Sequence, residues 1–201
     1  GGAIANRSGT MTVDASVFDG NSVQGSALGG AIANVSFGGE IRLTGSIVRN
    51  NTSETEGGGL YTVASPFYVT DSLIEGNSAN AGGGLSAGAS NGDSFFIERT
   101  TISGNTASFL GGGLYAVGSL VTSFIENSTI SGNVSTDTFG GGVGLNAGGQ
   151  VQITHTAVID NEALTFVNSV GGLSLFAGTG TLGSNLIANN PNGDCSATNQ
   201  S

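Results

Sequence analysis

Aromatic residues recur at one position of this sequence with a spacing that would place them side by side. Tyr68, Phe96 and Phe124 follow one another at equal intervals, and Arg42 precedes Tyr68 by a slightly shorter one. If these side chains point outward from stacked repeats, they form an aromatic strip of three rings with a guanidinium beside it. Exposed rings in a row serve as a contact for a covering loop, a protein partner or a carbohydrate. If the register is shifted, the same rings belong to the core.

Charged residues recur with the same spacing. Glu98 and Glu126 are separated by the interval that separates the aromatic residues, so they become neighbours of like charge in stacked repeats. There they either bridge a bound cation or remain two solvated carboxylates. Asp71 and Arg99 are separated by this interval too and predict a surface ion pair that sets the register. A further expected group places one arginine between two carboxylates: Asp19, Arg49 and Glu75.

Residues suited to catalysis are sparse. A polysaccharide lyase needs a basic residue to remove an acidic proton, and a glycoside hydrolase needs carboxylates about 5 to 9.5 Å apart; neither set stands out. Lysine is absent, and the one histidine, His155, lies between two threonines. The chain has no zinc-ligand cluster and no phosphate-binding loop. The sequence therefore predicts no enzymatic activity, no catalytic residues and no metal site.

The composition favours a folded chain of one domain. Of the 201 residues, 37 are glycine, but only 2 are proline and the hydrophobic fraction is 37%, which disfavours both collagen and disorder. The formal net charge of −10, without lysine, excludes a basic groove for nucleic acid and a polybasic membrane anchor. The apolar runs are all too short to cross a bilayer, so no membrane span is expected.

Two landmarks recur in step and define repeats of roughly 25 to 30 residues. One is a Gly-Gly pair followed by a small or branched apolar residue: Ala3, Ala31, Leu60, Leu85, Leu114, Val143 and Leu173. The other is an asparagine: Asn21, Asn51, Asn77, Asn105, Asn133, Asn161 and Asn190. We expect these asparagines to form a structural ladder inside a turn, each side-chain amide donating to one neighbour and accepting from the other.

Apolar columns aligned on the asparagine predict the strands. One column lies three residues before it: Phe18, Val48, Ile74, Ile102, Ile130, Val158 and Ile187. Another lies eight residues before it: Val13, Leu43, Val69, Ile97, Ile125, Ile153 and Leu182. Inward positions alternate with a period of two between ten and eight residues before the asparagine. The next inward position, three residues before it, follows after an odd number of residues, which indicates two short strands separated by a bend. A third strand is expected to open with the Gly-Gly pair.

A repeat of this length is too short for a βαβ unit, so each repeat is one coil made of strands and turns. The sequence predicts an all-β, right-handed parallel β-helix (solenoid) of about seven coils over residues 1–190. The handedness follows from the rule for parallel crossovers. Residues 191–201 are expected to be a polar tail or partial cap. Their single cysteine, Cys195, is either a free thiol or half of a bridge to another chain.

The chain resembles bacterial surface and secreted proteins of right-handed parallel β-helix fold, such as polymorphic outer-membrane protein passengers. The resemblance rests on Gly1-Gly2-Ala3-Ile4, on residues 29–32 with the same sequence, and on Phe18-Asp19-Gly20-Asn21. Most coils depart from the family pattern, with Ile or Val in place of Phe and Leu in place of Ala. The resemblance implies secretion, surface display, and adhesion or assembly, without a cofactor.

We therefore expect an extracellular or cell-surface protein with a structural or adhesive role. Its expected partners are itself, by head-to-tail stacking into a filament, the rest of a longer β-helix, or a cell-surface protein or carbohydrate; no nucleic acid is expected. A carbohydrate-binding or polysaccharide-degrading β-helix is one alternative, and an ice-binding solenoid is another. The threonines are scattered, however, and one Ser/Thr column is expected to line the bend: Ser16, Ser46, Ser72, Thr100, Ser128 and Thr156.

Overall fold

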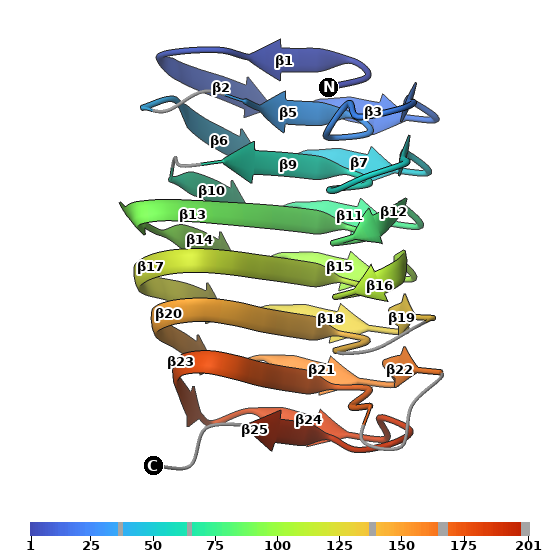
Figure 1. The fold of residues 1–201 in the computed structure, drawn as a ribbon, viewed down its shortest axis with the longest axis vertical. Helices are drawn as coiled ribbons and strands as arrows, with labels where there is room; N and C mark the ends of the chain where they lie inside the picture. The colour runs from blue at the N-terminus through green and yellow to red at the C-terminus, as the bar shows by residue number, and fades with distance from the viewer. Residues whose placement is uncertain (36–37, 64–65, 137–139, 165–168, 198–201) are drawn as a thin grey trace.

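A computed structural model describes residues 1–35, 38–63, 66–136, 140–164 and 169–197, so residues 198–201 of the expected tail lie outside the described part. The described chain is a parallel β-solenoid whose coils stack along one axis, with the first and last coils at opposite ends (Figure 1). Its described residues contain strands and no helix. One sheet has seven strands, one from each coil, which confirms the predicted fold class and repeat number.

Sheet A has twelve strands and two flanks. The front flank contains β1 (Ile4–Asn6), β5 (Ile32–Asn34), β9 (Leu60–Val63), β13 (Leu85–Asp93) and β25 (Cys195–Ala197). The side flank contains β2 (Thr10–Asp14), β6 (Glu40–Thr44), β10 (Phe67–Thr70) and β14 (Phe95–Glu98). Three long strands curve across both flanks: β17 (Leu114–Glu126), β20 (Val143–Thr154) and β23 (Leu173–Gly183).

Sheets B and C complete each coil. Sheet B contains β3 (Val17–Asp19), β7 (Ile47–Arg49), β11 (Leu73–Glu75), β15 (Thr101–Ser103), β18 (Thr129–Ser131), β21 (Ala157–Ile159) and β24 (Leu186–Ala188). Sheet C contains β4 (Ser22–Val23), β8 (Thr52–Ser53), β12 (Ser78–Ala81), β16 (Thr106–Leu110), β19 (Val134–Ser135) and β22 (Glu162–Ala163). Sheet C was not expected, because its inward column consists of small residues such as Ser53, Ala79 and Ala107, which do not stand out as an apolar column.

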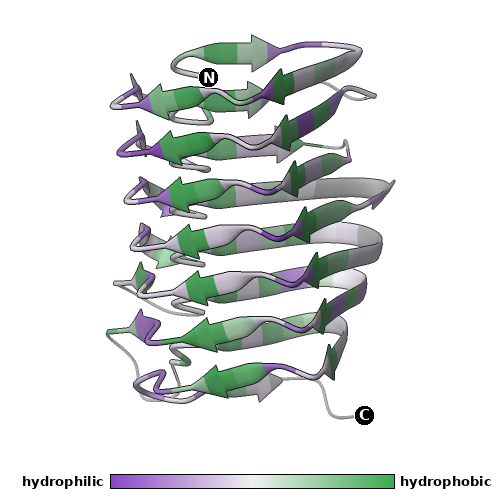
Figure 2. Cartoon of the chain, turned by 180° about the vertical axis from the view of Figure 1, so that it is seen from behind, coloured by the Kyte–Doolittle hydropathy of each residue, from purple (hydrophilic) through white to green (hydrophobic). Residues whose placement is uncertain are grey.

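The strand register confirms the columns that were aligned on the asparagine. Ile74 pairs with Ile102, and Ile102 pairs with Ile130, in successive strands of sheet B. All three side chains are fully buried. The hydropathy of the strands alternates accordingly along each coil, as Figure 2 shows from behind. Like residues therefore stack on like throughout the core.

The Gly-Gly column was misaligned in the first two coils. Ile32, rather than Ala31, pairs with Leu60, and Ile4 pairs with Ile32. The inward column is thus Ile4, which is partly buried, followed by Ile32, Leu60, Leu85, Leu114, Val143 and Leu173, which are buried. Later coils have a third glycine where Ala31 stands. At Gly113, an added Cβ would lie 2.6 Å from the carbonyl oxygen of Gly142, so the close approach of adjacent coils requires glycine there.

The expected bend between the side flank and sheet B is present in each coil. Its first residue has a left-handed backbone, with φ of 51° at Asp71, 48° at Arg99 and 49° at Asn127. The next residue is the expected serine or threonine. Its hydroxyl accepts from the coil before, as when the backbone amide of Ser46 donates to Ser72 Oγ over 3.1 Å. The bend therefore keeps its backbone amides bonded while the chain changes direction.

Candidate functional site

The aromatic strip lies on the outer face of the side flank. Phe95 and Ile97 are buried, with 0% and 1% of their surface exposed, whereas Phe96 between them is partly exposed. Tyr68 alternates in the same way with its buried neighbours on β10. Phe124 occupies the equivalent position on β17 and is also partly exposed. The three rings therefore point away from the core.

The strip forms a continuous stack. The ring centroids of Tyr68 and Phe96 are 4.8 Å apart with planes 5° from parallel, and those of Phe96 and Phe124 are 5.4 Å apart at 18°. Arg42 Cζ lies 4.2 Å from the Tyr68 centroid and covers the far side of that ring. Both faces of Tyr68 and Phe96 therefore have a partner within the strip. The ring edges face outward.

A shallow hollow of about 270 Å³ lies over the later part of the strip. It is lined by Phe96, Ile97, Glu98, Phe124 and Glu126. Glu98 and Glu126 are directly opposite each other on β14 and β17, as expected from their spacing. The hollow therefore combines an apolar surface with two neighbouring carboxylates.

The two carboxylates that line the hollow differ in their ion-pair partners. Glu98 accepts a hydrogen bond from Arg99, and Arg99 Nε also donates to Asp71 over 2.7 Å, so the expected Asp71–Arg99 pair forms. The Arg99 hydrogen bonds lower the pKa of Asp71, and Asp71 in turn raises the pKa of Arg99. Glu126 has no ion-pair partner among the described residues. The hollow consequently retains negative charge.

The group on sheet B is only partly as expected. Arg49 lies between Asp19 and Glu75 in the register, and its guanidinium pairs with Asp19 at 2.9 Å. No ion pair of the described residues involves Glu75. Asn50, at the bend that follows, also donates to Asp19 and, ahead of Arg49, lowers the pKa of that carboxyl. A side chain from the bend thus takes part in the pairing.

The asparagine ladder is continuous through seven rungs. Nδ2 of Asn105 donates to Oδ1 of Asn133 at 2.9 Å and to the carbonyl oxygen of Ile74 at 3.0 Å. Oδ1 of Asn105 accepts from Nδ2 and from the backbone amide of Asn77. The other rungs repeat these contacts from Asn21 to Asn190. Asp194 accepts from Asn190 Nδ2 at 2.8 Å and ends the ladder, because a carboxylate cannot donate onward.

A polar cluster on the front flank was missed from the sequence. Glu56 accepts a hydrogen bond from the buried hydroxyl of Ser86 at 2.8 Å. Tyr61 and Tyr115 occupy the same outward column as Ser86 on the coils before and after it, yet each is more than 90% buried. Burial, reinforced by Glu56, raises the pKa of both phenols. Only the alternation of tyrosine with small residues in this column could have signalled the cluster.

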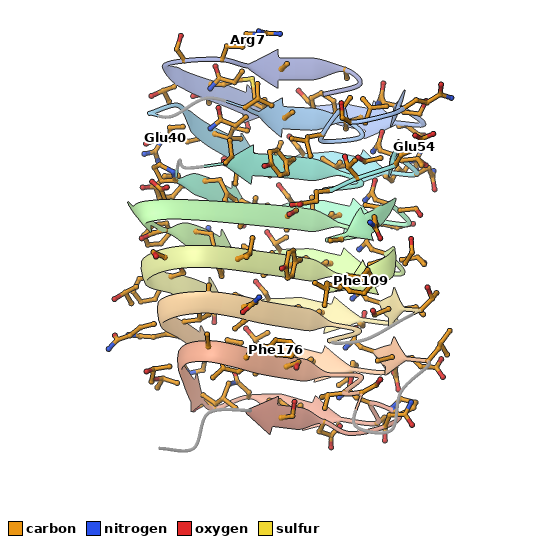
Figure 3. The ribbon with its side chains drawn as sticks, in the orientation of Figure 1. Arg7, Glu40, Glu54, Phe109 and Phe176 are labelled. Carbon is orange, nitrogen blue, oxygen red and sulfur yellow. The ribbon has the colours of Figure 1, made fainter. Side chains whose placement is uncertain are left out.

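The charged side chains lie around the outside of the solenoid. Glu40 lies where β6 begins and bonds Arg42 of the strip, on the opposite side of the molecule from Glu54 (Figure 3). Glu54 reaches back one coil and accepts from the backbone amide of Gly25 at 2.7 Å. On the side of the strip, the bond from Glu40 holds the Arg42 guanidinium over the ring of Tyr68.

The last coil has a second hollow, of about 190 Å³, at the end of the core. This hollow exists because Gly180 has no side chain to fill it, in a column where two earlier coils have Phe67 and Phe95. Cys195 lines it as a free thiol on an exposed residue. Partial shielding of the thiol from solvent, followed by the charge of Asp194, raises the pKa of Cys195. His155 lies at an exposed bend with φ of 50°.

Among the described residues, no three His, Cys, Asp or Glu side chains gather closely enough to hold a metal ion. In the same part of the chain, no helix has the length and apolarity needed to cross a membrane. No protein-family model, curated protein or solved structure matches this chain.

Proposed function

We propose that this chain is an extracellular structural or adhesive protein that displays the aromatic strip as its contact surface. The observation that carries the proposal is the outward, stacked arrangement of three rings on the side flank. Each ring is held by its neighbours before any partner arrives, so little side-chain entropy is lost on binding. Rings of this kind supply a large share of the binding energy in protein contacts.

The solenoid supports this role by its rigidity. Successive coils are bonded through sheets A and B and the asparagine ladder, and the first six coils also through sheet C. Neighbouring strands are about 4.8 Å apart, so seven coils form a rod roughly 30 Å long. A rod that is bonded along its whole length holds an exposed strip at a fixed place, as a display scaffold requires.

End-to-end assembly is the second part of the proposal. Within the described residues, the strands of the first coil have a partner on one side only, and so do β24 and β25 at the other end. Such edges can pair with a further coil. The ladder stops at Asp194, so a coil added beyond it would be held by strand pairing and apolar contact.

The adhesive role is tested by attachment of the labelled full chain to bacterial and animal cell surfaces. The triple variant Tyr68→Thr, Phe96→Thr and Phe124→Thr is expected to bind at least ten-fold more weakly, because it removes the exposed rings. The matched control is Val17→Thr with Leu186→Thr, which removes apolar surface that is 61% and 58% exposed on sheet B. Equal binding by the parent and the triple variant would reject the strip as the contact surface.

Light scattering and electron microscopy of the purified chain test assembly. Filaments or concentration-dependent stacks are the expected result. A monodisperse monomer at every concentration would remove assembly from the proposal and leave the adhesive role to the cell-binding experiment.

A further inference from the structure

We infer that the hollow over Phe96 and Phe124 receives an arginine side chain of a protein partner. This inference rests on the proposed function, since it names the chemistry that the aromatic strip would bind. The hollow offers the edges of Phe96 and Phe124 to the apolar stem of an arginine, and the carboxylates of Glu98 and Glu126 to its guanidinium.

The ring geometry favours an arginine over a sugar. Sugar rings bind aromatic side chains through the ring faces, and both faces of Tyr68 and Phe96 are occupied within the strip. The remaining face of Phe124 is toward Gln152, its neighbour on the next coil. The hollow is therefore lined by ring edges, and its two carboxylates suit the forked guanidinium of one arginine.

The other end of the strip provides an internal precedent. There, the Arg42 guanidinium lies 4.2 Å from the Tyr68 centroid and is bonded to Glu40. At the Phe124 end, the next residue in the column is the uncharged Gln152, so the column supplies no arginine to Glu126. An arginine from a partner would therefore form beside Glu126 the kind of arginine–carboxylate pair that Arg42 and Glu40 make at the other end.

Charge complementarity supports the same occupant. Asp71, Glu98 and Glu126 carry three negative charges around the hollow against the one positive charge of Arg99, which leaves a balance of −2. The chain as a whole carries −10. A field of this sign draws basic partners toward the surface and speeds their association at low salt.

The test is a titration of the ¹⁵N-labelled full chain followed by NMR. The probes are N-acetyl-arginine N-methylamide, its neutral citrulline analogue, and cellohexaose. We expect saturable shifts at residues 96–98 and 124–126 with the arginine probe, weaker at high salt, and none with citrulline. Glu126→Gln is expected to weaken binding about two- to five-fold, the factor for one surface ion pair. Glu75→Gln removes an exposed carboxylate of sheet B and should leave binding unchanged.

Gln152→Arg provides an independent check, because it places a guanidinium on the coil next to Phe124, where it competes with the probe for Glu126. This variant is expected to abolish the saturable shifts without any loss of carboxylates. Equal binding of the citrulline probe, or shifts with cellohexaose alone, would overturn the inference. The proposed function would survive that result if the triple ring variant still lost cell attachment, and it would fail if that variant attached like the parent.

Discussion

Replacement of one central rung, Asn105→Asp, should destabilise the solenoid in a pH-dependent way. The substitution keeps the shape of the side chain but exchanges the Nδ2 donor for an oxygen. That oxygen would face the carbonyl oxygen of Ile74 and Oδ1 of Asn133, which now accept at 3.0 and 2.9 Å. Both hydrogen bonds become contacts between acceptors, in a site with 0% exposure.

The expected cost follows from these contacts. A buried polar group left without its hydrogen bond costs about 1–3 kcal/mol, so two lost bonds predict a loss of about 3–5 kcal/mol at neutral pH. Burial and the facing oxygens raise the pKa of the introduced carboxyl above its ordinary value of about 3.9. Below about pH 4 the carboxyl is protonated in both the folded and the unfolded state, and it can donate one bond. The loss of stability should therefore be smallest there and grow as the pH rises.

Urea unfolding followed by circular dichroism, at pH 3.5 and pH 7, measures this difference. Hydrogen exchange at both pH values shows whether the loss is centred on the neighbouring coils. The matched control is Asn127→Asp at an exposed bend, because Asp71 occupies the equivalent position of another coil. If the two variants were equally stable at pH 7, or if Asn105→Asp showed no pH dependence, the hydrogen-bond directions assigned to the ladder would be wrong.

Other substitutions test separate features. Asn34→Ala should leave the stability unchanged or raise it, unlike a ladder substitution, because both polar atoms of this buried amide lack a hydrogen-bond partner among the described residues; chemical denaturation measures it. Gly113→Ala should lower the stability by about 1–3 kcal/mol, since its Cβ would overlap the next coil, and a melting curve would reveal this. Arg99→Gln should raise the pKa of Asp71 toward its ordinary value in an NMR titration. The Asp71–Arg99 pair therefore stabilises the folded parent at neutral pH, and this stabilisation is lost as the pH falls through the lowered pKa of Asp71. The variant has no such pair to lose. Cys195 should react with iodoacetamide more slowly than free cysteine at pH 8, because its pKa is raised.

The sequence carried most of the fold because the core repeats. Ile74, Ile102 and Ile130 share one column, and so do the asparagines that follow them, so the spacing alone predicted the correct strand register. Alignment failed where the residue type after the Gly-Gly pair changes. The first two coils have Ala3 and Ala31 where later coils have a third glycine, which shifted the expected column by one residue.

The surface was less predictable than the core. Side-chain spacing placed Glu98 beside Glu126 and Arg99 beside Asp71, since both pairs follow directly from the register. The spacing could not show which of its two carboxylate neighbours Arg49 pairs with, because Asn50 from the bend also bonds Asp19. The front cluster around Ser86 was also hidden, because it combines residues from an outward column with Glu56 from a connection between strands.

The uniform ladder makes a coil an interchangeable unit of length. Asn77, Asn105, Asn133 and Asn161 make the same contacts at a constant spacing of 28 residues along the chain. Duplication of residues 105–132 would lengthen the rod by one strand spacing and leave every original rung in place. Insertion of a single residue within a strand would instead displace the side chains of that coil from their columns, whereas connections absorb changes in length, since some rungs are 26 or 30 residues apart. The architecture therefore allows the distance between its two ends to change in whole-coil steps, with the binding chemistry on its flank left intact.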